Sequence, residues 1–176
     1  MPTAFPTDHA TVVQAIVARL RVALALNESQ CYFSMDSWDS APKLPAGGNF
    51  IVRVHVQGGP FPADLLVGGG MFGAVERATT FIAWYTRVKL DRGDHAHAAA
   101  FDPARGIFAV KGQILQAMLQ SDLLDDEGNA LTIDMMGPLR SFGPKQLTAK
   151  DDAIYVSGLS FSTDFAWNIN PLPTPS

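Results

Sequence analysis

The sequence predicts an α+β domain: a mainly antiparallel sheet of four to five strands that includes a long β-hairpin, with two helices packed on one face. Two stretches repeat apolar residues at the three- and four-residue spacing of a helix, and three longer stretches alternate apolar and polar residues as strands do. A chain of 176 residues can bury one hydrophobic core but is short for two domains. We therefore expect an N-terminal extension over residues 1–7, one domain over 8–169 and a flexible C-terminal tail over 170–176.

The first helix is predicted over residues 8–25, where Thr7 or Asp8 can cap the free N–H groups of the first turn. The residues on its apolar stripe are Val12, Val13, Ile16, Val17, Leu20 and Leu24. After this helix we expect a short strand over residues 30–35. The prolines and glycines that follow predict a loop over residues 36–49.

The long hairpin is predicted from two alternating stretches. In residues 50–57, Phe50 and the valines after it face one way, while Arg53 and His55 face the other way, which we expect to be solvated. Residues 74–90 are rich in aromatic and β-branched residues, which favour strands. We expect the two stretches to pair with each other.

The connection between these two strands is expected to be an assembly element. Residues 58–73 contain six glycines and two prolines, so ordering this segment alone costs much conformational entropy. They also contain large apolar side chains, which do not suit a loop that stays in water. The candidate interface residues are Phe61, Leu65, Leu66, Met71 and Phe72. We expect this tip to be mobile in the isolated subunit and ordered against a partner.

A second helix is predicted over residues 102–121, because Asp102 can cap it and Pro103 suits the first helical position. Its apolar face leads into an acidic segment that closes the helix. Beyond that segment we expect a short strand over residues 130–135 and a loop over residues 137–152.

The closing strand, over residues 154–169, has the longest alternation in the chain. The side chains that we place against the two helices are Leu159, Phe161, Phe165 and Trp167. Ser160 and Ser162 then lie on the opposite face, which we expect to be solvated.

Composition excludes several classes of function. Thirteen Lys and Arg against 17 Asp and Glu give a net charge of −4, without the basic excess that holds phosphate backbones. No apolar stretch approaches the roughly 20 residues that cross a bilayer, and the first residues do not resemble a secretory signal. Cys31, the single cysteine, is expected to be reduced and buried. Charged residues make up only 17% of the chain, which suggests that a partner covers part of the surface.

Three patterns resemble chemical sites without fitting one. Gly68–Gly73 matches the dinucleotide-binding G-x-G-x-x-G pattern, but the residues after it alternate like a strand. His95 and His97 have the spacing of metal ligands on a strand, but no further histidine is available nearby to complete a set. The acidic run from Asp122 to Glu127 lacks the ligand order of a calcium loop. We therefore predict no enzyme activity, no cofactor and no metal.

The order of the predicted elements resembles that of the tail terminator proteins of long-tailed bacteriophages. The segments that carry the resemblance are the opening helix Thr11–Leu24, the hairpin Phe50–Leu90, the helix Pro103–Leu119 and the closing strand. The glycine-rich tip and the loops over residues 36–49 and 137–152 depart from that family.

The resemblance implies a structural protein of the virion, made in the host cytoplasm, that forms a hexameric ring. Such a ring caps the tail tube and joins it to the connector of the head and neck, and DNA passes through it without specific binding. An acidic chain would not grip the passing phosphates. The alternatives are another oligomeric α+β binding or scaffold module, such as a neck or minor tail protein, and a small metal-dependent enzyme that uses His95 and His97.

Overall fold

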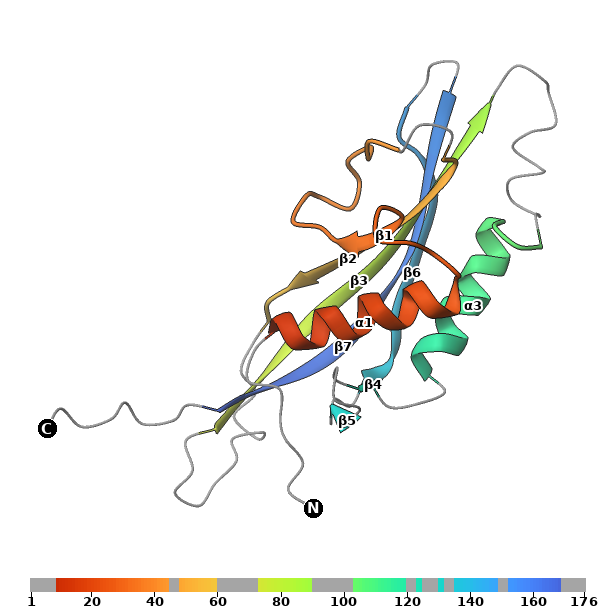
Figure 1. Cartoon of the computed structure of the whole chain (residues 1–176). Helices are drawn as coiled ribbons and strands as arrows, with labels where there is room; N and C mark the ends of the chain where they lie inside the picture. Colours follow the sequence, from red (N-terminus) through yellow and green to blue (C-terminus); the bar gives the residue numbers. More distant parts are fainter. Residues whose placement is uncertain are drawn as a thin grey trace, which may run out of the picture.

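The computed structural model describes residues 9–44, 48–59, 73–89, 103–119, 123–124, 130–131, 135–148 and 152–168. The two helices are α1 (His9–Ala23) and α3 (Ile107–Leu119). The main sheet contains β1 (Cys31–Phe33), β2 (Phe50–Gln57), β3 (Gly73–Lys89), β6 (Met135–Gln146) and β7 (Asp152–Asn168) (Figure 1). Two short strands, β4 (Leu123–Leu124) and β5 (Ala130–Leu131), form a separate pair.

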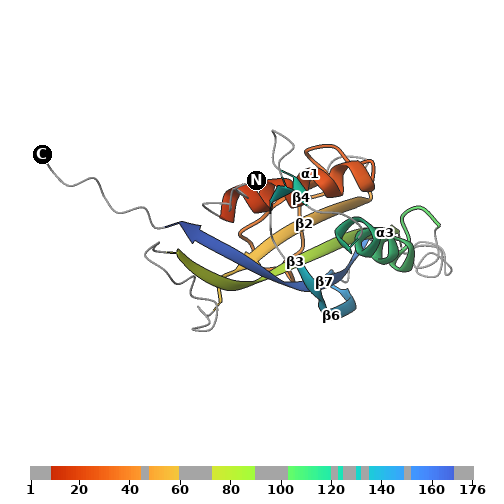
Figure 2. The same ribbon diagram turned by 90° about the horizontal axis from the view of Figure 1, so that it is seen from below.

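The main sheet has the strand order β1-β2-β3-β7-β6. The β1–β2 pair is parallel and the other three pairs are antiparallel. Both helices lie on the same face of this sheet, as Figure 2 shows. The predicted α+β class, with a mainly antiparallel sheet of five strands and two helices on one face, is therefore confirmed.

The larger hydrophobic core lies between the helices and the sheet. From α1 and α3 it includes Val12, Ile16, Leu20, Val110 and Ile114, and from the strands Val52, Val54, Ile82, Trp84, Leu159 and Phe161. The helical stripe and the alternation of the strands predict these positions, because each pattern places most of its large apolar residues on one face. The side chains of residues 164–168 lie outside the described part of the chain, so the expectation for Phe165 and Trp167 remains a prediction.

Helix α1 ends in a Schellman motif. The N–H of Leu26 donates to the carbonyl of Arg21 at 2.9 Å, and the N–H of Ala25 donates to that of Val22 at 3.3 Å. Ala25 has φ of 48°, the left-handed conformation that this motif requires and that glycine usually supplies. The motif turns the chain back, so β1 runs beside the helix that it follows.

Strands β2 and β3 are antiparallel neighbours, with Phe50 opposite Thr86 and Gln57 opposite Thr79. The connection that we predict as a mobile tip, residues 60–72, lies outside the described residues. Strands β3 and β7 pair over their whole length, from Gly73 opposite Asn168 onwards. Strand β2 pairs only with residues 79–86 of β3, so the first residues of β3 and the last residues of β7 extend beyond β2 (Figure 2).

The prediction of a loop over residues 137–152 is wrong, because β6 occupies most of that stretch. Prolines and glycines indicated a loop, but β6 is an edge strand, where a missing N–H need not break a ladder. Its pairing with β7 is irregular instead, with shifts of register around Pro138 and between Phe142 and Lys145. Gly143 has φ of 80°, and a Cβ there would lie 2.5 Å from the carbonyl oxygen of Val156.

Two predicted boundaries also need correction. Helix α3 begins at Ile107, about one turn later than predicted, because residues 103–106 form turns before the regular helix. In the stretch predicted as a strand over residues 130–135, Ala130 and Leu131 form β5 and Met135 already belongs to β6, while residues 132–134 lie outside the described residues. Local patterns fix such ends poorly, because packing decides where an element stops.

The second face of the sheet is buried, contrary to the prediction that Arg53, His55, Ser160 and Ser162 face water. A segment that we call the strap, residues 34–44, contributes to the cover of this face. The residues of the second, smaller core are Leu44, Ile51, Ala83, Tyr85, Ile154 and Val156, with Tyr32, Trp38, Phe142 and Leu147 packed against them. The apolar Trp38 and Leu44 in the predicted loop were the sequence signal for this cover.

We predict that Phe161→Ala lowers the free energy of unfolding by about 3–5 kcal/mol, because it leaves a cavity beneath the helices. Ser162→Ala, on the other face of the same strand, should cost less than about 1 kcal/mol, because it removes a single hydroxyl. Urea unfolding of the two variants measures both values. Equal losses would mean that the register of β7 is wrong by one residue.

Candidate functional site

The structure leaves the predicted interface untested. Phe61, Leu65, Leu66, Met71 and Phe72 all lie outside the described residues. The base of their segment is fastened, because the N–H of Gly59 donates to Glu76 Oε1 at 3.0 Å.

The sequence patterns that resembled chemical sites give a mixed result. His95 and His97 lie outside the described residues. Gly73, the last glycine of the G-x-G-x-x-G pattern, begins strand β3, so no helix starts there to bind a pyrophosphate. The prediction that a strand follows these glycines is confirmed. Among the residues that the structure describes, no three His, Cys, Asp or Glu side chains come together as metal ligands.

Cys31 is a core residue, as predicted. Its side chain is fully buried, with Sγ 3.9 Å from the carbonyl oxygen of Val17. Burial raises the pKa of the Cys31 thiol to about 12, although the nearby Arg21 acts in the opposite direction. The thiolate that nucleophilic or metal chemistry needs is therefore disfavoured at neutral pH.

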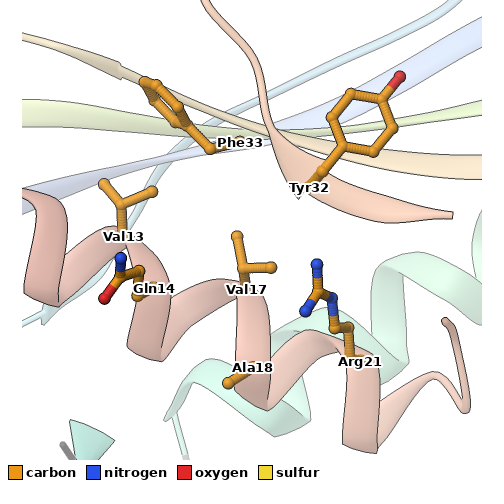
Figure 3. A pocket seen from close by; sticks show the side chains of 7 residues that line it. All are labelled: Val13, Gln14, Val17, Ala18, Arg21, Tyr32 and Phe33. Atoms are coloured by element: carbon orange, nitrogen blue, oxygen red, sulfur yellow. The ribbon is translucent and has the colours of Figure 1, made fainter. Parts of the chain in front are cut away.

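A groove of about 450 Å³ lies between α1 and the edge strand β1, and we call it the α1–β1 groove. Figure 3 shows Val13, Val17, Ala18 and Arg21 on the helix side and Tyr32 and Phe33 on the strand side. Val13, Val17 and Arg21 follow one another at intervals of four positions, and Ala18 lies three positions before Arg21, which places these residues along one side of α1. The lining also includes the polar Gln14, so the groove combines apolar side chains with the polar groups of Gln14 and Arg21. Val13 and Val17 are already buried as members of the larger core.

The outer edge of β1 is open beside this groove. The ladder with β2 uses the carbonyl of Gln30, which accepts from the N–H of Val52 at 2.7 Å, and the N–H of Ser34, which donates to the carbonyl of Val54 at 2.9 Å. Cys31 and Phe33 therefore direct their main-chain groups to the other side.

The main-chain groups of Cys31 have local partners on this open side. Its N–H donates to the carbonyl of Asn27 at 3.0 Å, and its carbonyl accepts from Arg21 Nε at 2.9 Å. Among the described residues, no such hydrogen bond to the main-chain N–H or carbonyl of Phe33 is found on this side. The arrangement can accept an apolar side chain or one further main-chain partner, and it offers no acid, base or nucleophile.

Exposed apolar side chains gather around the groove. Val22, one turn beyond Ala18 on α1, is 84% exposed, and Met35, two residues after Phe33, is 92% exposed. Phe33 itself is about half exposed. Surface of this kind is typical of a site that contacts another protein.

A second apolar surface runs along the outside of α3. Phe108 is 60% exposed and Leu119 about half exposed, and Leu115 lies between them on the same side. Phe108, Gly112, Leu115 and Leu119 follow one another at intervals of four, three and four residues. This spacing places all four on one side of the helix, where they form a stripe. A Cβ built on Gly112 would meet nothing within 4 Å. We call this stripe the α3 ridge.

The strap is held over the second face by a buried cation. The Arg53 guanidinium lies 3.7 Å from Asp36 Oδ2, and its Nη1 donates to Ser40 Oγ at 3.4 Å. Arg53 Nε donates to the hydroxyl of Tyr32 at 3.3 Å. The central carbon of the Arg53 guanidinium lies 5.2 Å from the centre of the Tyr85 ring. Arg53 thus joins β1, β2, β3 and the strap in one cluster.

Aromatic contacts complete the attachment of the strap. The hydroxyl of Tyr85 donates to the carbonyl of Trp38, and burial raises the pKa of Tyr85 to about 12, so this donor stays protonated. The Trp38 ring lies 4.4 Å from that of Phe142 on β6. Phe142 in turn lies where a Cβ on Gly158 would be. The cluster is structural, because its polar groups bind one another.

His55 lies beside this cluster and is buried, and its Nε2 has no hydrogen-bond partner among the described residues. Burial and the charge of Arg53 lower the pKa of His55, although the carbonyls of Ser34 and Asp36 oppose the shift. The folded state therefore favours the neutral imidazole.

No known protein family matches the sequence, and no curated protein matches it either. Neither described helix has the length and the apolar run that crossing a membrane needs. The function is therefore inferred from the surfaces of the fold. The α1–β1 groove and the α3 ridge were not predicted, because each combines residues that become neighbours only on the folded surface.

We predict that Arg53→Met lowers the free energy of unfolding by about 1–3 kcal/mol, because it leaves the hydroxyls of Tyr32 and Ser40 without this partner. Asp36→Asn should cost less than about 1 kcal/mol, because the Asp36 carboxylate is mostly exposed. Denaturant titration measures both. A larger loss for the Asp36 variant would contradict this account of the strap.

The neutral state of buried His55 predicts a loss of stability in mild acid. The lowered pKa means that its stabilising contribution is fully present above about pH 6.5 and is lost as the pH falls through the pKa of the folded state. The melting temperature of the native chain should therefore fall more between pH 8 and pH 5 than that of His55→Gln. Carboxylates such as Asp39 titrate in both proteins, so the difference isolates His55. Parallel curves would contradict the prediction.

Proposed function

We propose that this chain is a structural, ring-forming subunit of the tail terminator kind, which caps the tail tube of a long-tailed bacteriophage and joins it to the neck. The order of helix, short strand, two longer strands, helix and long closing strand supports the proposal, because the resemblance rests on these elements. Strand β6 lies where the sequence predicts a loop, so it is a departure from that order. The placement of α1 and α3 on one face of the sheet supports it as well.

The main support for the proposal is a set of exposed apolar side chains that belong to neither hydrophobic core of the subunit. The helices bury one face of the sheet, and the strap helps to bury the other. The large apolar side chains that belong to neither core and remain exposed are Val22, Phe33 and Met35 near the α1–β1 groove and Phe108 and Leu119 on the α3 ridge. A subunit whose own core is complete still gains free energy by burying such surface against another protein.

The charges of these surfaces also favour a protein partner. Of the residues that line the groove, only Arg21 is charged, and Arg21 lies 3.6 Å from Glu28 Oε1. The α3 ridge has no charged residue. A surface that grips nucleic acid presents several unpaired cations, so we propose that DNA passes the ring without being held.

The glycine-rich tip is the proposed contact to the tail tube or to the head–neck connector. Its apolar residues Phe61, Leu65, Leu66, Met71 and Phe72 would order against that partner, because burying them can offset the entropy lost by six glycines. The hydrogen bond from Gly59 to Glu76 would anchor the base of this contact on β3.

The test is the native mass of the purified protein together with negative-stain images, alone and with isolated tail tubes. We expect a hexameric ring with six times the subunit mass of 18.9 kDa, or a monomer that forms rings at the ends of tubes. A defined oligomer that ignores tube ends would favour another scaffold module. A chain that remains monomeric with and without tubes would overturn the proposal.

A further inference from the structure

We propose that the strap, residues 34–44, is an acid-sensitive cover: when His55 is protonated, the strap lifts from the second face of the sheet while the helical core stays folded. The proposal goes beyond the proposed function, and its test uses the isolated subunit. It concerns a local opening, which differs from the loss of global stability expected in mild acid because only one segment of the chain moves.

The strap is attached to the sheet mainly through side chains. Among the described residues, its one hydrogen bond between main-chain groups and the sheet is at its start, where the N–H of Ser34 donates to the carbonyl of Val54 at 2.9 Å. The middle of the strap is held by the side chains of Arg53 and Tyr85. A segment held in this way can open without breaking the strand ladders of the sheet.

His55 lies beneath the start of the strap. It follows Val54, whose carbonyl binds Ser34, and the carbonyls of Ser34 and Asp36 face its imidazole. The strand register places Phe81, which has no charge, opposite His55 on β3. The His55 side chain is only 8% exposed. The imidazole is thus enclosed between the sheet and the strap, and it becomes fully hydrated only when the strap moves.

The charged and titratable groups around His55 favour the neutral imidazole. Arg53 lies two residues away on the same side of β2 and is a permanent cation. From the strap, Asp36 is the opposing charge, but its carboxylate is 69% exposed and already lies 3.7 Å from Arg53. Tyr32 on β1 and Tyr85 on β3 are uncharged at neutral pH. A proton on His55 would therefore add a second buried cation beside Arg53 without a second carboxylate.

The hydrogen bonds of His55 act in the same direction. Its Nε2 has no hydrogen-bond partner among the described residues, so a proton placed there would leave a buried N–H without an acceptor. Once the strap is open, the same N–H binds water. The open form therefore binds protons more tightly than the closed form, and opening becomes easier as the pH falls below about 6.5. The second core that the strap covers keeps the strap closed at neutral pH.

The test follows the strap and the helical core separately in one molecule. Trp38 belongs to the strap and Trp84 to the core beneath the helices, so labelling with 5-fluorotryptophan gives each region its own fluorine NMR signal. The variants Trp38→Phe and Trp167→Phe each remove one of the three signals, which assigns them all. Between pH 8 and pH 5 the Trp38 signal should move towards its solvent-exposed position, with an open-to-closed ratio that rises by up to about tenfold per pH unit. The Trp84 signal should keep its folded position.

The His55→Gln variant separates His55 from the carboxylates, because Asp36 and Asp39 still titrate in it. We expect its Trp38 signal to keep the pH 8 position, whereas His9→Gln, at the start of α1, should behave like the native chain. If His55→Gln does not fold, His55→Asn takes its place. A Trp38 signal that moves equally without His55 would assign the opening to the carboxylates and overturn the proposal. A native chain in which Trp38 does not respond, or responds only together with Trp84, would overturn it as well.

Discussion

The pairing of β3 with β7 is the constraint on which the rest of the structure depends. Each strand has 17 residues, and they are paired from end to end at the centre of the sheet. The two helices pack on the side of Ile82 and Phe161, and the strap packs on the side of Tyr85. Every other element is therefore placed relative to this one long pair, and a slip of one residue would exchange its two faces.

Burial on both sides of this pair explains which surface remains for partners. A sheet covered by helices alone would keep a broad free face, and assembly could use it. Here the strap, held by Arg53 and Tyr85, occupies much of that face. Uncovered apolar groups are left at the rims of the helical layer, around Phe33 on one side and Phe108 on the other. A protein partner would therefore contact the apolar side chains around Phe33 or around Phe108 rather than the centre of the sheet.

The two edges of the sheet differ in how they receive another chain. Strand β6 is interrupted by Pro138, Pro144 and shifts of register, which are the features that keep an edge strand from pairing further. Strand β1 has only three residues, and Arg21 and Asn27 already bind the main-chain groups of Cys31. Neither edge therefore favours an unlimited extension of the sheet.

The sequence by itself determined the α+β class, both helices and the face that Leu159 and Phe161 occupy, because these follow from local periodicity. It also indicated the buried state of Cys31, which lies beside Tyr32 and Phe33 without a local His or Lys. It could not show that β6 is a strand, since its glycines and prolines are tolerated only where β7 supports them. Nor could it show that Arg53 and His55 are buried, because the strap that covers them comes from another part of the chain. The groove and the ridge, too, were decided by the tertiary structure alone, because exposure depends on which surfaces the rest of the fold leaves uncovered.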